Sequence, residues 1–285
     1  MKIGITMFAT ERGLTPVELG RAVEQRGFDS LFLPEHSHIP TSRNTVWPGS
    51  RPGKNDPLPD YYTRMFDQIV ALSMIGAVTE RLMLGTSVTL VPQHDPVWLG
   101  KQIATLDHLT GGRFMLGVGF GWNVEQGATH GVRFQERRDM TEEYIATMRT
   151  LWCDEVSEFH GKHFNLEPSW SFPKPAQAAG PPVLVGGMGP RTYDAIGRYA
   201  DGWMPITGRP SIKDRLAPIQ EAFEKYGRDP ADIQVVIAGA TTDPEGLANL
   251  REEGVQHALL TVWSEDETEI MQKLDEFSRL KALLY

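Results

Sequence analysis

Cysteine is almost absent from this chain of 285 residues, which contains only Cys153. A single cysteine cannot form an internal disulfide, and this fits a protein of a reducing compartment. The first apolar run begins at Ile3 and does not show the pattern of a signal peptide, in which a basic segment is followed by an apolar segment and then by small residues. No apolar run reaches the ~18 residues that a membrane-spanning helix needs, and the longest, 69–78, has charged neighbours. We therefore expect a cytoplasmic protein without a membrane partner.

Positive charge is also in short supply. Lys and Arg number 28 against 37 Asp and Glu, which leaves a formal net charge of −9. Nucleic-acid binding needs clustered basic residues, so this balance argues against a nucleic-acid partner. Hydrophobic residues make up 40% and charged residues 23% of the chain. These values are typical of a globular protein and exclude disorder over the whole chain.

Short apolar runs alternate with helical patterns along the whole chain. Eight strands are expected, at 3–8, 30–33, 82–88, 114–118, 183–185, 202–206, 233–238 and 258–262. They are continuous apolar runs, as in a parallel sheet that is buried on both faces. Strict alternation of strand and helix predicts an α/β fold, a single (β/α)8 TIM barrel over residues 1–285. A doubly wound open sheet is the structural alternative.

Two segments interrupt this alternation, after the second and the fourth strand. Residues 39–62 are rich in Pro, Gly, Arg and Asn, and a loop of this length is typical of an active-site lid. Residues 155–175 form the second insertion, in which the stretch around Gly161 predicts a small hairpin. We expect the first segment at the carboxyl ends of the strands and the second as a cap or interface element.

Residues that could carry chemistry follow the second strand. His36 lies where a barrel places its active site, and a histidine there can act as a general acid or base. A loop histidine that bonds its neighbours is the plainer alternative. His36 and His38 could also hold a metal, but no histidine follows the fifth, sixth or seventh strand, and we expect no metal. The chain has neither a Gly-x-Ser-x-Gly motif nor a Walker loop.

Two glycine turns follow the fourth and fifth strands. Residues 117–123 would let a cofactor approach the backbone closely, although the dinucleotide fingerprint Gly-x-Gly-x-x-Gly is absent. Residues 186–192 have Pro190 at the start of a helix, whose free N–H groups would suit a phosphate, with Arg191 or Thr192 adding to the site. Either turn alone also fits a loop that needs glycine for its conformation. A set of aromatic residues could line a pocket: Trp47, Tyr61, Tyr62, Trp122 and Trp203.

Together these segments resemble the bacterial luciferase-like superfamily, most closely its branch of oxidoreductases that depend on the deazaflavin coenzyme F420. The resemblance covers nearly the whole chain up to the seventh strand and is strongest over 79–123. It implies a TIM barrel with the deazaflavin across the carboxyl ends of the strands. The residues that carry it are 27–36, 58–59, 62–71, 79–88, 95–96, 105–113, 117–123 and 186–190.

The resemblance also implies roles for single residues. Glu35 and His36 match an acidic–histidine pair beside the ring, in which the histidine acts as acid or base. Ser87 and Val88 match a non-prolyl cis peptide that bulges against the back of the ring. The other cofactor contacts expected are Val118, Gly119, Trp122, Asn123, Gly186, Gly187, Met188 and Arg191.

One position departs from the pattern of this branch. Its sugar-phosphate dehydrogenases carry a glutamate as proton donor in the first glycine turn, where this chain has Phe120. Phenylalanine cannot transfer a proton, so we do not expect glucose-6-phosphate to be the substrate and expect a small, rather apolar molecule. Candidate substrate contacts are His38, Arg43, Tyr61 and Phe120, with Arg64 as a further candidate or a structural ion pair.

The motifs alone do not separate F420 from FMN. A two-component FMN-dependent monooxygenase on the same barrel is therefore the alternative, and a barrel that has lost catalysis and only binds is a third. A separate flavin or F420 reductase is an expected partner, and the resemblance implies a homodimer. The acidic oligoglutamate part of F420 would favour basic residues at the pocket mouth, for which the candidates are Lys101, Arg133, Arg137, Arg138 and Arg191.

Overall fold

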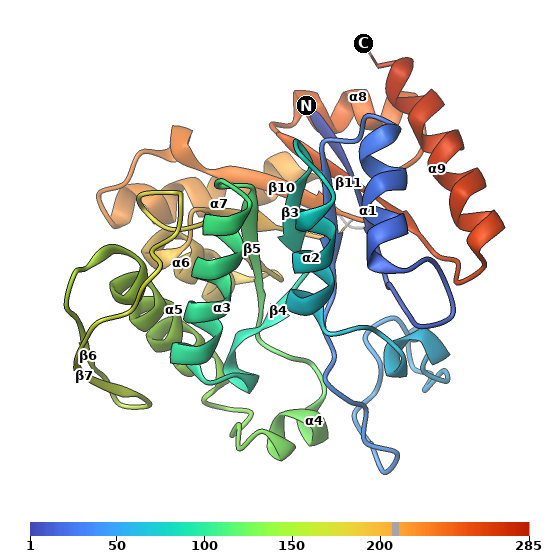
Figure 1. Cartoon of the computed structure of the whole chain (residues 1–285). Helices are drawn as coiled ribbons and strands as arrows, with labels where there is room; N and C mark the ends of the chain where they lie inside the picture. The colour runs from blue at the N-terminus through green and yellow to red at the C-terminus, as the bar shows by residue number, and fades with distance from the viewer. Residues whose placement is uncertain (207–210, 285) are drawn as a thin grey trace.

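Eight apolar runs of the sequence become eight parallel strands that close into a ring. The computed structural model describes residues 1–206 and 211–284 (Figure 1). The ring has the order β3-β2-β1-β11-β10-β9-β8-β5, and the pairing of β3 with β5 closes it. The TIM barrel is thus confirmed, and the open sheet is excluded. Its strands are β1 (Lys2–Met7), β2 (Ser30–Leu33), β3 (Met83–Thr86), β5 (Phe114–Gly119), β8 (Val183–Gly186), β9 (Gly202–Met204), β10 (Gln234–Ala238) and β11 (His257–Val262).

Helices cover the outside of the barrel (Figure 1). Local sequence sets where they begin: Thr15 and Glu18 form a capping box at α1, and Asp95 caps α3 through two backbone N–H groups. The helices are α1 (Pro16–Gln25), α2 (Gln68–Ala77), α3 (Pro96–Leu109), α4 (Val124–Thr129), α5 (Arg137–Cys153), α6 (Pro190–Tyr199), α7 (Ile212–Lys225), α8 (Pro244–Glu252) and α9 (Glu267–Ala282). Three short 3-10 turns are η1 (Asp60–Thr63), η2 (Val91–Gln93) and η3 (Pro230–Asp232).

Two predicted strands end earlier than the apolar runs suggest. β3 stops at Thr86, and after Ser87 and Val88 the chain continues as the short β4 (Thr89–Leu90), which pairs with β5. β9 stops at Met204 because Pro205 has no N–H to offer the sheet. The predicted hairpin is confirmed as β6 (Ser157–His160) and β7 (Asn165–Ser169), an antiparallel pair beside α5.

The core has two layers, because successive residues of a strand face opposite sides. In β2, Leu31 and Leu33 pack with the large cluster between strands and helices, whereas Phe32 belongs to a separate buried cluster. We assign that second cluster to the barrel interior, where Gly85 leaves room for the ring of Phe32. Its buried members are Phe32, Met115, Leu184, Met204, Val236 and Leu259.

The carboxyl ends of the strands lie at the lower end of Figure 1. Residues 39–63 and α4 lie there together, while both chain termini lie at the opposite end. The first insertion therefore covers the end of the barrel on which active sites of this fold are built. In the described part of the chain, no helix has the length and apolar character required to cross a membrane.

Candidate active site

His36 lies directly after β2, at the carboxyl end of the barrel. Its Nδ1 is 2.7 Å from Oε1 of the fully buried Gln126 in α4. The orientation of this amide is set by its nitrogen, which donates to Ser37 Oγ at 3.4 Å. Because the amide oxygen can only accept, Nδ1 carries the proton and Nε2 keeps its lone pair. The indole N–H of Trp122 points at that Nε2 from 3.4 Å.

The protonation state of His36 follows from its surroundings. Burial lowers its pKa below the ordinary value, and this outweighs the hydrogen bond that His36 donates to Gln126 and the charge of Glu35, which act in the opposite direction. The imidazole is therefore neutral at pH 7. The rings of Tyr62 and Trp122 lie against it, with centroids 5.3 and 5.8 Å away. His36 can therefore act as a base that accepts a proton at Nε2, with the rings of Tyr62 and Trp122 beside it.

Glu35 has both carboxylate oxygens engaged away from His36. One accepts the backbone N–H of Leu90 at 2.6 Å, and the other lies 2.6 Å from His94 Nε2. Burial acts to lower the pKa of His94, but the hydrogen bond and charge of Glu35 outweigh it and raise that pKa. In this arrangement Glu35 ties the end of β2 to β4 and η2. A direct part in catalysis remains a prediction for this residue.

Three of the predicted cofactor contacts meet at the barrel mouth. The peptide bond between Ser87 and Val88 is cis, as the family resemblance implied. The Val88 side chain sits so close to Gly119 that a Cβ there would lie 2.4 Å from it, and a Cβ on Gly186 would lie 3.5 Å from it. Val118, beside Gly119, is fully buried in the core. The glycines thus keep side chains away from the protruding Val88.

Asn123 caps α4 and holds an unpaired donor. Its Oδ1 accepts the backbone N–H of Gln126 at 3.0 Å, which positions the residue that bonds His36. Its Nδ2 is buried and has no hydrogen-bond partner among the described residues. A buried donor without a partner is costly, so this atom fits a site that a ligand acceptor completes.

The second glycine turn joins β8 to α6. Gly187 and Gly189 have φ angles of 99° and 96°, a region that glycine adopts without steric cost. Trp203 Nε1 donates to the carbonyl of Gly187 at 2.9 Å and holds the turn from inside. Gly189 is the N-cap of α6, and no side chain caps that helix. The first N–H groups of α6 are therefore free of side-chain acceptors, as a phosphate site requires.

Three arginines gather around this turn. Arg138 of α5 donates to Thr192 Oγ1 at 3.2 Å, Arg215 of α7 reaches Met188 Sδ at 2.8 Å, and Arg191 is exposed in the first turn of α6. None of the three forms an ion pair with a carboxylate of residues 1–206 or 211–284. Burial lowers the pKa of Arg138, and the charge of Arg191 adds to that effect. An acidic protein thus carries uncompensated positive charge at this one turn.

The other basic candidates have different partners. Lys101 donates to the carbonyl of Phe172 near the hairpin, and Arg133 pairs with Glu136 at 2.8 Å. Arg137 lies over the ring of Phe134 beside Arg138 and keeps a buried Nε without a described partner.

The segment 39–62 is tied down over His36 by Glu125 of α4. This carboxylate accepts the Thr45 hydroxyl at 2.6 Å and the backbone N–H groups of Asn44 and Thr45 at 2.7 and 3.2 Å. These bonds, first among them that of the Thr45 hydroxyl, lower the pKa of Glu125 to about 2. Trp47 of the segment packs edge-on against Tyr62, with ring centroids 5.9 Å apart.

The predicted substrate contacts lie in three different places. Arg43 stacks over the ring of Trp122 at 5.7 Å, and Tyr61 packs on Phe8 at 4.7 Å, both near His36. His38 turns instead toward Ser37 and His130. Phe120 is buried, with the Arg138 guanidinium 4.1 Å above its ring. Arg64 pairs with Asp60 and Glu11 at 2.7 Å each, the structural alternative considered for it.

The metal alternative finds no support in this geometry. Within residues 1–206 and 211–284, no group of three or more His, Cys, Asp or Glu side chains is placed to hold an ion. His36 and His38 point to different partners, Gln126 and Ser37.

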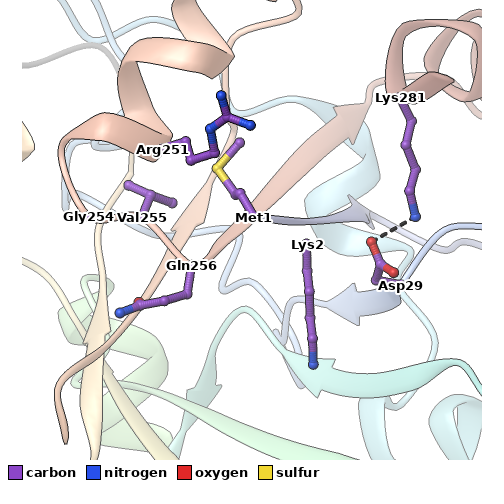
Figure 2. A pocket seen from close by; sticks show the side chains of 8 residues that line it. All are labelled: Met1, Lys2, Asp29, Arg251, Gly254, Val255, Gln256 and Lys281. Atoms are coloured by element: carbon purple, nitrogen blue, oxygen red, sulfur yellow. Dashed lines mark hydrogen bonds and ion pairs between the residues drawn. The ribbon is translucent and has the colours of Figure 1, made fainter. Parts of the chain in front are cut away.

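A cavity of about 650 Å³ opens at the other end of the barrel (Figure 2). Lys2, Asp29 and Gln256 on its rim stand at the amino ends of β1, β2 and β11. Lys281 pairs there with Asp29 at 2.7 Å. Active sites of this fold lie at the carboxyl ends of the strands, so this cavity is separate from the candidate site.

Gln126 is the residue that sequence reasoning missed. A signal for it was present, because Asn123 followed three positions later by Gln126 is the spacing of an N-cap and its third helical residue. That pattern predicts the start of α4. It does not predict that the Gln126 side chain crosses to His36, which is 90 residues away.

Comparison with known proteins adds to this geometry. Residues 11–277 match the sequence profile of a family described as luciferase-like monooxygenase. An uncharacterized protein of Mycobacterium tuberculosis is 39% identical over 260 residues, which cover 91% of each chain. A Rhodococcus erythropolis protein named F420-dependent glucose-6-phosphate dehydrogenase is 30% identical over 88% of this chain and 72% of its own.

Solved structures share the fold at low identity. An F420-dependent secondary alcohol dehydrogenase in complex with an F420-acetone adduct matches with a TM-score of 0.77, 18% identity, and coverage of 100% of this chain and 99% of its own. The monooxygenase RslO1 from Streptomyces bottropensis has the same TM-score at 17% identity, with 99% of both chains covered.

Proposed function

Because the chain belongs to the luciferase-like monooxygenase family, we propose that it is an oxidoreductase that transfers a hydride between coenzyme F420 and a small, rather apolar substrate. The observation that carries this proposal is the His36–Gln126 hydrogen bond of 2.7 Å, which leaves a neutral imidazole with an accepting Nε2. A hydride leaves an alcohol together with a proton, and a positioned base must take that proton. The Rhodococcus relative, named an F420-dependent dehydrogenase, supports this choice of cofactor.

The residues present fit a deazaflavin or flavin. Val88 offers an apolar wall at the barrel mouth, Asn123 Nδ2 is a buried donor without a partner, and the uncapped start of α6 suits a phosphate. When bound, F420 supplies the hydride-transfer chemistry, and the protein supplies orientation and electrostatics. In our proposal Val88 orients the ring, the turn 186–189 holds the phosphate, and His36 takes or returns the proton at Nε2.

Positive charge at the turn favours F420 over FMN. Both cofactors carry a phosphate, but only F420 extends from it into an acidic oligoglutamate. Arg138, Arg191 and Arg215 surround the turn and have no carboxylate partner among the described residues. The phosphate of FMN, with a charge of about −1.5 to −2, would leave roughly one of the three positive charges unbalanced, whereas the phosphate of F420 together with several carboxylates would offset all three.

Titration of the purified protein with F420 and, in parallel, with FMN tests the cofactor. We expect F420 to bind more tightly, and Arg191→Gln to weaken F420 more than FMN. Lys101→Gln is the matched control, because Lys101 is engaged at the hairpin. Tighter binding of FMN would favour the monooxygenase, which needs a separate reductase as partner. If neither bound, the cofactor assignment would be wrong while the barrel would stand.

We also propose that two copies of the chain associate through α2 and α3. These neighbouring helices expose Val70, Met74 and Trp98, the last with 70% of its surface accessible. Large apolar side chains exposed on two neighbouring helices favour an interface at this place. Analytical ultracentrifugation should give a dimer for the unmodified chain and a monomer for Trp98→Lys. A monomeric unmodified chain would contradict this proposal.

A further inference from the structure

A cavity of about 1050 Å³ opens at the carboxyl ends of β10 and β11, on the same end of the barrel as His36. Two large apolar side chains are exposed on its lining: Trp263 directly after β11 with 65% of its surface accessible, and Ile206 after β9 with 72%. The rest of the lining is formed by Gly239, Ala240, Thr241, Thr242, Thr261, Ser264, Glu269, Gln272, Lys273, Glu276 and Phe277.

A continuous row of rings links this cavity to His36. Trp263 stacks on Phe8 at 5.8 Å between centroids and lies 6.1 Å from Tyr61. Tyr61 stacks on Tyr62 at 5.3 Å, and Tyr62 contacts the imidazole of His36 at the same distance. In this row of rings, which we call the aromatic wall, Trp263 is the ring that also belongs to the described lining of the cavity.

The ion pairs of η1 hold this wall in place. Asp60 accepts from Arg12 at 2.6 Å and from Arg64 at 2.7 Å, and Arg64 also pairs with Glu11. These contacts fix Tyr61 and Tyr62 of η1 against the loop that follows β1. The aromatic wall is thus anchored and does not depend on a ligand for its arrangement.

The charges on the described part of the cavity lining favour an uncharged ligand. Its only charged side chains among the described residues are Glu269, Lys273 and Glu276. Lys273 pairs with Glu276 at 2.6 Å, and Glu269 accepts the Ser264 hydroxyl at 2.7 Å. Among the described lining residues, a phosphate or carboxylate would meet two carboxylates and one ammonium group that is already paired.

We infer that this cavity is the subsite for a planar, uncharged aromatic part of the substrate, which stacks on Trp263 while the reacting carbon lies near His36. The inference rests on the hydride-transfer function proposed above and names the substrate class for it. A pair of aromatic rings gains more binding free energy than the burial of its apolar surface alone provides. The exposed indole of Trp263, which lines the cavity together with Ile206, offers a ring for such a pair.

Calorimetric titration with 2-naphthylmethanol, an uncharged two-ring alcohol, tests the subsite, both on the protein without cofactor and on the protein loaded with reduced F420, which cannot oxidise the alcohol. We expect the alcohol to bind and its anionic counterpart 2-naphthoate to bind far more weakly. Trp263→Ala should weaken the alcohol roughly fivefold to tenfold, the size of an aromatic pair, whereas Trp263→Phe should retain most of the affinity. Trp170→Ala is the control, because Trp170 is also an exposed tryptophan but follows the hairpin strand β7.

Three results would overturn the inference: equal binding by Trp263→Ala and the unmodified chain, equal binding of naphthoate and the alcohol, or displacement of the alcohol by F420. The affinity for F420 is measured separately on the same preparations. Failure of F420 to bind, with Trp263-dependent binding of the alcohol intact, would refute the proposed function and leave the aromatic subsite standing.

Discussion

Replacement of Gln126 tests whether this side chain sets the working form of His36. Gln126 is fully buried, and its Oε1 accepts the Nδ1 proton of His36 at 2.7 Å. Leucine at this position has nearly the same volume but no acceptor. In Gln126→Leu the Nδ1–H group would be buried without a partner, so the proton would move to Nε2, the atom that must accept the substrate proton.

The size of the effect follows from the burial. A buried donor left unpaired costs about 1–3 kcal/mol. Since about 1.4 kcal/mol corresponds to a tenfold change in an equilibrium, we expect the productive tautomer, and with it kcat, to fall roughly tenfold or more. The affinity for F420 should change little, because Gln126 bonds only His36, Ser37 and the Asn123 cap.

The pH profile separates this role from a merely structural one. His36 has a pKa below the ordinary value, so activity that needs its neutral form is lost only as the pH falls through that lowered pKa. Gln126→Glu keeps an acceptor for Nδ1–H and adds a negative charge, which raises the pKa of His36. We expect this variant to retain kcat at high pH and to lose it at a higher pH than the unmodified enzyme. A Gln126→Leu enzyme with unchanged kcat and pH profile would refute the reasoning.

Three further predictions address the base, the segment over it and the barrel interior. His36→Ala should lower kcat by about 10²–10⁴-fold while F420 still binds, as steady-state kinetics and F420 titration would show; unchanged turnover would remove His36 from the mechanism. Glu125→Ala removes the three bonds that hold 44–45 and should raise KM for the substrate about threefold to tenfold with little change in kcat. Burial lowers the pKa of His257 to about 4, whereas its ordinary value is 6.5. As the pH falls below 6.5, His257 therefore becomes protonated in the unfolded chain before it does so in the folded protein. The free energy of unfolding should decrease as a result, by roughly 3 kcal/mol at pH 4. Urea unfolding of His257→Gln across this range should show a flatter profile, and an equally steep one would contradict the assignment.

The architecture could be predicted because each strand is a continuous apolar run and the helix starts carry explicit signals. Thr15 with Glu18, and Asp95 with Pro96, mark two helix starts in the sequence, and both are where the pattern puts them. The apolar runs do not mark where pairing stops. β9 ends at Met204 because of the missing N–H of Pro205, although the apolar run continues to Ile206.

The site was harder to predict than the barrel, because its decisive contacts join distant parts of the chain. A strand-end position identified His36 as a candidate, but its tautomer depends on Gln126, 90 residues later. Glu35 was placed beside the reacting ring by resemblance alone, whereas its oxygens bond Leu90 and His94. Side-chain direction after a strand end depends on the loops that pack there, and no local pattern in the sequence specifies it.

Phe120 packs against Arg138 and leaves the positive charge of that arginine uncompensated. A glutamate there would bring a carboxylate beside Arg138, and the pair would neutralise each other. Phe120 instead places a ring 4.1 Å from that guanidinium, which holds Arg138 in position without cancelling its charge. Arg138 then keeps its charge for the turn at Thr192, where we propose that the anionic part of F420 binds. If F420 binds at this turn as proposed, the carboxylate of Phe120→Glu should pair with Arg138 and weaken F420 binding, as titration of this variant would show; unchanged affinity would contradict the reasoning.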